Sequence, residues 1–341
     1  MKVQFAGPLA VALSFLGGAD TRAASPMPVK VMIVTMFAPE AQVWLDHLPL
    51  TQAIAVPGLS SDYPYVHCAT SGVCLITTGM GQTNAAASMS ALIYSRQFDL
   101  RHSYWLVAGI AGINPKEGTL GSAAWSRYLV DWDLQWELDS REAPKGWATG
   151  YTGINTKNPD QKPALDYRTE VYRLNEALLQ RAYALSKSVR LVDSADAAKS
   201  RAGYSPPADL PPSVIQCDTL TGDTWWSGAL LGERAEDWTK LLTNGHGQYC
   251  TTQQEDNATY AVLARATTAR LADDQRVAIL RTGADFDRPP PGGSDVANLL
   301  DYAKQGGGFR LAIANLFITG NPLLQAIVND WAHWQKDVPV Q

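Results

Sequence analysis

The chain has 341 residues, of which 46% are hydrophobic and 18% are charged, and its formal net charge at pH 7 is -5. This length is sufficient for one large hydrophobic core, and α/β folds of this size are often a single domain. Because the sequence contains no basic stripe, nucleic acid and an anionic membrane surface are not expected as partners.

The first 24 residues resemble an export signal. Lys2 provides a positive charge, residues 5–16 form an apolar run, and small residues that suit cleavage follow near Ala23. The alternative is a disordered or anchoring N-terminus. No other segment approaches the roughly 20 apolar residues that span a bilayer. We therefore expect a signal peptide over residues 1–24 and a mature domain over residues 28–341, without a membrane span, in the periplasm or secreted.

The four cysteines suit an oxidising compartment. Cys68 and Cys74 flank a predicted hairpin turn, so we pair them, and Cys217 with Cys250 then follows by elimination. The even number of cysteines permits this pairing without proving it. No Cys/His spacing is typical of a zinc site, and we expect neither a metal nor a cofactor.

The first predicted strand of the mature chain covers residues 29–35, an apolar and β-branched run. Pro39 fits the first turn of a following helix over residues 40–48, where the charge of Glu40 is favourable. That favourable charge is also a sufficient structural explanation for Glu40. Residues 63–78 alternate as a predicted hairpin that ends in a buried strand.

Two glycine-containing turns follow predicted strands. Gly79 and Gly81 come after the hairpin and precede an Ala-rich helix, so the first N–H groups of that helix are expected to face a crevice. This turn matches a dinucleotide-binding motif only loosely, because the third glycine is missing. The next predicted strand, over residues 104–107, ends at a second turn that contains Gly109.

The middle of the chain predicts elements of several kinds. They are a strand over residues 122–130, a surface excursion over residues 139–165, a helix over residues 167–186, a loop over residues 194–213 and a strand over residues 214–217. Trp225 and Trp226 follow in a polar turn. Aromatic rings stack well on flat ligands, so Trp225 is a candidate for binding a planar base, although packing of both tryptophans on the core explains the motif equally well.

Two further helices are predicted in the last third of the chain. The first covers residues 251–264, whose polar start contains Gln254 and Glu255. The second covers residues 309–334 and carries apolar side chains at helical spacing. The alternation of apolar strands with helices predicts a single α/β domain with three layers, α/β/α, and a mixed, twisted central sheet.

Two carboxylates stand at the end of a late strand. The stretch from residue 277 opens as a short apolar run, which predicts a buried strand that breaks at Gly283. Asp285 and Asp287 follow, before a Pro/Gly loop. Ligands of open α/β sheets bind beyond the carboxyl ends of the strands, which makes both aspartates candidate site residues. The alternative is that one caps the next helix and the other is solvated.

Taken together and in this order, these motifs resemble the purine nucleoside permease family of fungi and bacteria, which is similar to the nucleoside phosphorylase and nucleosidase superfamily. The resemblance runs from about residue 29 to the C-terminus. It implies a nucleoside phosphorylase-like fold, purine nucleosides as ligands and a homo-oligomer, either a dimer or a trimer.

The resemblance also implies roles for individual residues. Glu40 falls where the nucleosidases have a glutamate that activates the attacking water. Asp285 falls at the aspartate that protonates the leaving purine, and Glu255 at the glutamate that binds the ribose hydroxyls. The resemblance implies further ligand-binding positions of three kinds. They are glycines of the two turns, an aromatic residue that stacks on the base, and the neighbour of the ribose-binding glutamate: Gly79, Gly81, Gly109, Trp225 and Gln254. Three positions depart from the family pattern, namely Ile110, Gln254 and Ala284.

These residue types suit cleavage of an N-glycosidic bond. The leaving base needs a protonated carboxylic acid, and the attacking water needs an ionised carboxylate. Burial at a strand end is expected to raise the pKa of Asp285. Asp287 is the alternative proton donor and a candidate for binding the purine. We expect hydrolysis rather than phosphorolysis, because residues 79–82 and 109–112 contain no Arg, Lys, Ser or Thr to bind phosphate, and Thr83 is the nearest donor. The alternative function is a non-catalytic nucleoside-binding component of purine nucleoside transport.

Overall fold

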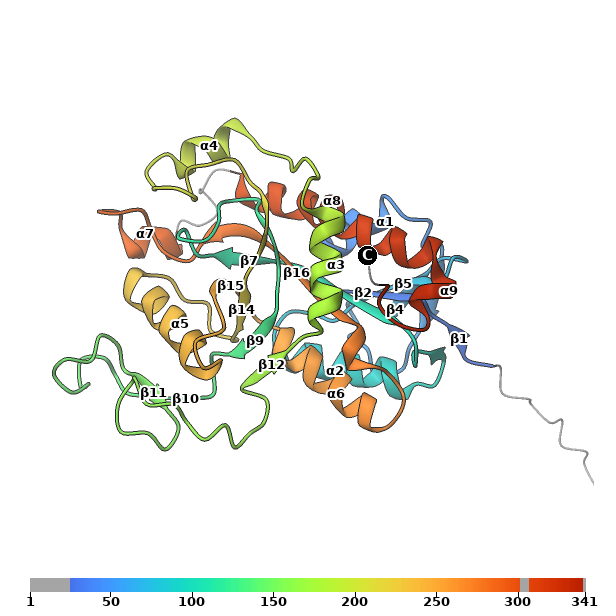
Figure 1. The fold of residues 1–341 in the computed structure, drawn as a ribbon, viewed down its shortest axis with the longest axis horizontal. Helices are drawn as coiled ribbons and strands as arrows, with labels where there is room; N and C mark the ends of the chain where they lie inside the picture. The colour runs from blue at the N-terminus through green and yellow to red at the C-terminus, as the bar shows by residue number, and fades with distance from the viewer. Residues whose placement is uncertain (1–24, 301–306, 340–341) are drawn as a thin grey trace, which may run out of the picture.

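The computed structural model describes residues 25–300 and 307–339, so the predicted signal peptide over residues 1–24 lies outside the described residues. A mixed sheet of 12 strands forms the centre of the molecule (Figure 1). Its main path runs in the order β12 (Val171–Arg173), β9 (Tyr128–Asp131), β14 (Asp218–Thr221), β15 (Tyr249–Gln253), β7 (Tyr104–Ile113), β2 (Val31–Thr35), β5 (Val73–Thr77), β4 (Tyr65–Cys68) and β3 (Gln52–Ala55).

Strand β16 (Val277–Phe286) lies beside this path. It pairs in parallel with β7 over nearly its whole length and antiparallel with β8 (Ala123–Trp125), which also pairs with β13 (Val214–Gln216). Two short pairs are separate from the sheet: β1 (Met27–Pro28) with β6 (Phe98–Asp99), and β10 (Gln135–Glu137) with β11 (Tyr151–Gly153). β7 therefore pairs with β2, β15 and β16, three strands that each lead to predicted site residues.

Helices cover both faces of the sheet (Figure 1). On one face pack α1 (Ala38–Leu45), α3 (Glu176–Ser186) and α8 (Gly308–Asn329), and on the other α2 (Gln82–Tyr94) and α6 (Asp256–Thr268). α5 (Ala229–Leu242) packs beside β15. The short helices are α4 (Ala195–Arg201), a 3-10 turn (Asp274–Arg276), α7 (Asp295–Leu300) and α9 (Trp331–Trp334). The predicted three-layer α/β/α fold with a mixed central sheet is confirmed.

The side chains of β2 show why the sheet is covered on both faces. Successive side chains of a strand point to opposite faces. Val31 and Ile33 belong to a core cluster with α1, α3 and α8, whereas Met32 and Val34 belong to a second cluster with α2 and α6. All four are at most 1% exposed. A run of consecutive apolar residues therefore supplies both layers of the core.

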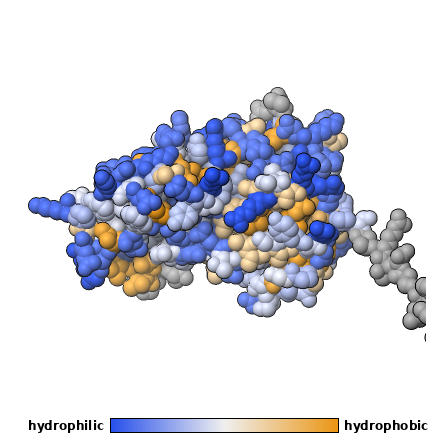
Figure 2. Space-filling model, turned by 90° about the horizontal axis from the view of Figure 1, so that it is seen from below, coloured by the Kyte–Doolittle hydropathy of each residue, from blue (hydrophilic) through white to orange (hydrophobic). Residues whose placement is uncertain are grey.

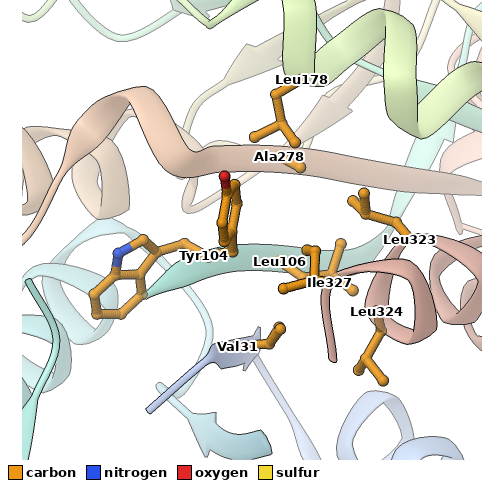
Figure 3. A pocket seen from close by; sticks show the side chains of 9 residues that line it. Val31, Tyr104, Leu106, Leu178, Ala278, Leu323, Leu324 and Ile327 are labelled. Carbon is orange, nitrogen blue, oxygen red and sulfur yellow. The ribbon is translucent and has the colours of Figure 1, made fainter. Parts of the chain in front are cut away.

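Helix α8 is a core helix that also satisfies the criterion for a membrane span. Figure 3 shows its apolar side chains facing those of β2 and β7 across a gap with no room for a water molecule: Leu323, Leu324, Ile327, Val31, Tyr104 and Leu106. Among the described residues, α8 is the one helix long and apolar enough to cross a membrane, and half of its apolar window is buried. The expectation that no segment approaches this length is therefore wrong, because a helix packed on a sheet can be as apolar as a membrane span.

Two strands are longer than the sequence predicts. β7 does not end before Gly109 but runs to Ile113, and β16 runs through Gly283 to Phe286. A Cβ atom at Gly109 would lie 2.5 Å from Nη1 of Arg281, and one at Gly283 would lie 2.9 Å from Cγ2 of Ile113. These glycines permit close packing inside a strand instead of ending it.

Other boundaries also differ from the prediction. The segment predicted as a helix over residues 167–186 starts with β12, and α3 begins only after Asn175, whose side chain accepts hydrogen bonds from the N–H groups of Ala177 and Leu178. An asparagine N-cap ends the strand-like stretch and starts the helix. The predicted strand over residues 122–130 is two strands, the loop over residues 194–213 contains α4, and the C-terminal helix is divided into α8 and α9.

Both predicted disulfides are present. Cys68 and Cys74 lie directly opposite each other on the antiparallel strands β4 and β5. Cys250 on β15 is bonded to Cys217, which immediately precedes β14. Disulfides persist mainly in oxidising environments, so this pair of bonds is typical of an extracellular or secreted protein.

Candidate active site

One cavity of about 580 Å³ lies against the last residues of β7, β15 and β16 and the segments that follow β2 and β14. Six of the predicted site residues line it: Glu40, Trp225, Gln254, Glu255, Asp285 and Asp287. The exposed hydrophobic side chains of Met80, Trp225 and Phe309 also line it. Elsewhere on the surface, too, apolar residues interrupt a largely hydrophilic face (Figure 2). The cavity thus combines carboxyl groups with an apolar rim.

The predicted glycines do not line the cavity but lie directly behind residues that do. Gly79 and Gly81 have φ values of 87° and 89°, which only glycine adopts readily, and they enclose the cavity residue Met80. A Cβ atom at Gly109 would lie 2.8 Å from Oε1 of Glu40. These glycines therefore shape the turn and allow Glu40 to approach the backbone of β7.

Glu40 lies in the first turn of α1, which Pro39 helps to start, and is 1% exposed. The N–H of Met36 donates to its Oε2 and the N–H of Ile110 donates to its Oε1, both at 2.7 Å. Burial raises the pKa of Glu40 to about 8, although the charge of Arg281 and both hydrogen bonds act in the opposite direction. The carboxyl group can therefore exchange a proton near neutral pH.

Arg281 organises the centre of the site from β16 and is 1% exposed. Its guanidinium donates to both carboxylate oxygens of Asp256, at 2.7 and 3.2 Å, and to Oε2 of Glu255 at 3.1 Å. It also donates to the side chain of Gln253 and to the carbonyl of Ile110. All these acceptors belong to the protein, so the buried cation is compensated before any ligand binds.

Carboxylates also occupy the start of α2. The N–H of Gly81 donates to Oε1 of Glu255 at 3.0 Å, and the N–H of Gln82 donates to Oδ1 of Asp223 at 2.8 Å. Asp133 accepts hydrogen bonds from the N–H of Asp223 and from the Gln82 side chain. A helix N-terminus attracts anions, and here the anions are side chains of the same protein.

Asp285 reaches the cavity through a β-bulge. Gly283 is opposite Ala111, whereas Asp285 is opposite Gly112, so Ala284 is an extra residue on β16. A Cβ atom at Gly112 would lie 3.6 Å from Oδ2 of Asp285. Among the described residues, the partly exposed Asp285 side chain has no hydrogen-bond or ion-pair partner. Burial raises the pKa of Asp285 to about 7, and the charge of Asp287 acts in the same direction.

Asp287 has a different environment, although it is only two residues away. Its carboxylate accepts hydrogen bonds from Nε and Nη2 of Arg288, at 2.8 and 3.1 Å, and from the hydroxyl of Tyr249 at 2.7 Å. Its side chain is 0% exposed. At this strand end, Asp287 therefore has three donors, whereas Asp285 has no partner among the residues that the structure describes.

The adjacent tryptophans have separate positions. Trp226 is 6% exposed and stacks on Trp132 with ring centroids 5.4 Å apart, so it packs the core, although it also forms part of the cavity wall. Trp225 is 54% exposed and lines the cavity. Gln254, also on the cavity wall, donates from its side chain to the carbonyl of Asp223 at 2.7 Å. Packing on the core therefore holds for Trp226, whereas base binding by Trp225 stays a prediction.

Sequence reasoning gave no role to Arg281, Asp256 or Asp223. Arg281 had a signal, because it is a charged residue inside the apolar run of β16, and a buried charge requires a partner. Its partner, Asp256, lies 25 residues earlier in the chain. Asp223 had no comparable signal, since a polar turn next to a glycine is usually solvated.

Comparison with known proteins identifies relatives over most of the chain. A family model described as purine nucleoside permease matches residues 28–339. A probable purine nucleoside permease from Schizosaccharomyces pombe is 42% identical over 317 residues, covering 89% of this chain and 90% of that protein. A purine nucleoside permease from Candida albicans is 39% identical over 308 residues, covering 89% of this chain and 75% of that protein.

Solved structures with a similar fold are nucleosidases and a hydrolase. A 5'-methylthioadenosine/S-adenosylhomocysteine nucleosidase from Neisseria meningitidis has a TM-score of 0.53 and 14% identity, covering 87% of this chain and 99% of that one. Futalosine hydrolase from Helicobacter pylori has a TM-score of 0.52 and 12% identity, covering 89% and 98%. At these identities the likeness shows the nucleoside phosphorylase-like fold alone. By the family model and the two fungal relatives, the chain belongs to the purine nucleoside permease family.

Proposed function

We propose that this protein hydrolyses the N-glycosidic bond of purine nucleosides. The observation that carries the proposal is the convergence of Glu40, Glu255 and Asp285 on one cavity that Trp225 also lines. They come from α1, from the junction of β15 with α6 and from β16, so their meeting is a property of the whole fold. The names of the fungal relatives support purine nucleosides as the ligands.

The proposed reaction uses two carboxyl groups in opposite states. Asp285 gives its proton to N7 of the purine while the electron pair of the C1'–N9 bond passes to the leaving base. A water oxygen bonds to C1' and its proton passes to the ionised Glu40. Glu255 accepts hydrogen bonds from the ribose hydroxyls, and the ring of Trp225 stacks on the purine. The products are a free purine and ribose, and the two carboxyl groups exchange their protons with solvent before the next cycle.

Two features favour water over phosphate as the nucleophile. The backbone N–H groups of Met36, Ile110, Gly81 and Gln82 already donate to protein carboxylates. Among the described residues that line the cavity, Arg281 is the one cation, whereas four acidic residues line it: Glu40, Glu255, Asp285 and Asp287. The carboxylates of this set that are ionised in the proposed reaction disfavour an anion and stabilise the positive charge that develops on the ribose.

We also propose that cleavage takes place outside the cytoplasm and supports nucleoside uptake. The two disulfides support an oxidising compartment. In this proposal residues 1–24 are a cleaved export signal and residues 28–341 form the one functional domain. A homo-oligomer, dimer or trimer, completes the proposal, and size-exclusion chromatography with light scattering tests it.

The experiment that tests the function is incubation of the purified protein with adenosine, guanosine and inosine, with and without phosphate. We expect free ribose in both buffers, at the same rate. Asp285→Asn should remove most of the rate, whereas Asp62→Asn is the matched control, because Asp62 is exposed and does not line the cavity. Ribose 1-phosphate formed only in phosphate buffer would show that the nucleophile is phosphate.

The second candidate is a non-catalytic nucleoside-binding component of transport, which the permease names of the relatives favour. A pure binder would release no sugar, and Asp285→Asn would leave its affinity for nucleosides almost unchanged. Isothermal titration calorimetry of the unchanged protein and of Asp285→Asn, together with the assay for released sugar, distinguishes the hydrolase from the binding component.

A further inference from the structure

Asp287 is surrounded by donors that favour its ionised form. Burial raises the pKa of Asp287, and the charge of Arg288 and the hydrogen bonds from Arg288 and Tyr249 act in the opposite direction. Arg288 and Tyr249 together direct three donors at its two oxygens. Donors of this kind stabilise the ionised carboxylate. Asp287 lines the cavity, but its side chain is 0% exposed and its two oxygens already accept from three donors, so a proton on it would displace one of them. Its backbone is fixed as well, because the N–H donates to the carbonyl of Ile113 and the carbonyl accepts from the N–H of Gly228.

Asp285, the proposed acid, has the opposite set of contacts. It lines the same cavity, it is partly exposed, and it has no hydrogen-bond or ion-pair partner among the described residues. Two carboxyl groups close together do not both ionise readily. When donors hold one of them ionised, the unpartnered neighbour keeps its proton, which is how paired carboxylates divide acid and base roles.

We propose that Asp287 is a positioning residue whose fixed negative charge keeps the neighbouring Asp285 protonated in the neutral range. The inference rests on the proposed function, in which Asp285 is the proton donor. It gives Asp287 a role without substrate contact, in place of the role of a second acid or a base-binding group.

Charged and titratable groups on the surrounding elements determine how much of the negative charge of Asp287 is neutralised. Arg288 divides its hydrogen bonds between Asp287 and Glu236 of α5, so one guanidinium serves two carboxylates. Lys116 pairs with Glu236 at 3.1 Å, on the side toward solvent. Tyr249 of β15 and Tyr204, which donates to the Arg288 carbonyl, are phenols with a raised pKa and stay neutral. The pKa of Asp285, about 7, is raised first by burial and next by Asp287.

The test is Asp287→Asn, read out through the pH dependence of the rate. Removing the charge should lower the pKa of Asp285 by about one unit, which moves the limb that Asp285 sets near pH 7 to lower pH. The rate at the optimum should fall about tenfold, because less of the singly protonated protein then carries its proton on Asp285. Tyr249→Phe removes one hydrogen bond but no charge, and should leave both limbs within a few tenths of a unit.

A second measurement does not depend on catalysis. Carbon-13 NMR of carboxyl-labelled aspartate, with the Asp285 signal assigned by Asp285→Asn, should show a lower midpoint for Asp285 in Asp287→Asn. If nucleosides are not cleaved and this midpoint still falls, the proposed function fails and the role of Asp287 stands. Should Asp287→Asn not fold, Glu236→Gln gives Arg288 more fully to Asp287 and should lower the midpoint by a smaller amount.

Two outcomes would overturn the inference. One is an unchanged Asp285 midpoint in folded Asp287→Asn. The other is a loss of the rate at every pH in Asp287→Asn while Asp285→Asn remains active, because Asp287 itself would then be the proton donor.

Discussion

Arg281 and Asp256 form a two-point contact in which Nη2 and Nε of the guanidinium meet the two carboxylate oxygens at 2.7 and 3.2 Å. Both side chains are at most 1% exposed. The pair joins β16 to the first residue of α6 and leaves Arg281 able to contact Glu255 as well. Asp256 therefore holds the arginine in the orientation that the rest of the site requires.

Asp256→Asn should destabilise the protein strongly, because it leaves a buried guanidinium without its main counter-charge. Loss of one partner of a buried ion pair costs about 3–5 kcal/mol. The free energy of unfolding in urea measures this loss. Asp99→Asn, which breaks the solvent-exposed pair with Arg101, is the control and should have little effect. Equal losses in the two variants would contradict the importance of burial.

Glu40→Gln should change how stability depends on pH. The folded pKa of Glu40, about 8, is above its ordinary value of 4.5, so the folded protein retains a proton that the unfolded chain loses. The contribution of Glu40 to stability is therefore present below pH 4.5 and falls as the pH rises toward 8, by at most about 1.4 kcal/mol per unit. Urea unfolding between pH 5 and pH 8 should show a smaller decrease in Glu40→Gln than in the unchanged protein, whereas an identical slope would contradict this assignment.

The rate of nucleoside hydrolysis should have a bell-shaped dependence on pH with its maximum between about 7 and 8, the pKa values of Asp285 and Glu40. Below this range both groups are protonated and the base is missing. Above it both are ionised and the acid is missing. Measurements of kcat/KM from pH 5 to pH 10 test the pH of the maximum. A rate that is constant over this range would be incompatible with two titrating carboxyl groups.

The tryptophan pair should give two different phenotypes. Trp225→Ala should leave the fold intact and weaken nucleoside binding by about 1–3 kcal/mol, the size of a base-stacking contact. Trp226→Ala should instead lower stability by about 3–5 kcal/mol, because Trp226 is 6% exposed and packs on Trp132. Calorimetric titration and thermal unfolding of each variant measure the two effects. If Trp225→Ala unfolds the protein and does not change affinity in the folded fraction, Trp225 is a packing residue.

Gly109→Ala should inactivate the site. The added Cβ would lie 2.1 Å from Cε of Met36 and 2.5 Å from Nη1 of Arg281, so both side chains and Glu40 must move. A misplacement of this size costs roughly 10²-fold in rate. Gly203→Ala, where the nearest atoms are 3.4 Å away, is the control and should retain full activity. Near-normal kcat/KM in a folded Gly109→Ala protein would show that the close approach is not required.

The sequence predicts the parts of this protein that depend on local patterns. Val31 to Val34 form a run that is apolar on both faces, and this predicts a buried strand without knowledge of its neighbours. Cys68 and Cys74 are close in sequence, so the turn between them predicts their bond. The family resemblance contributed the meeting of Glu40, Glu255 and Asp285 in one site.

The remainder depends on contacts between distant segments. Gly109 and Gly283 were predicted as strand ends because isolated glycines usually weaken strands, but both meet side chains packed against them. Arg281 and Asp256 acquire their roles from each other across two elements. The difference between Asp285 and Asp287 depends on Tyr249 and Arg288, and sequence spacing alone does not contain that information.

The cavity wall extends along the chain from Met36 to Phe309, and its last contribution is the start of α8. A ribosome must therefore complete almost the whole polypeptide before the wall can close. If the chain is exported unfolded, the cavity, and with it the cleavage proposed above, would arise only in the compartment in which folding is completed.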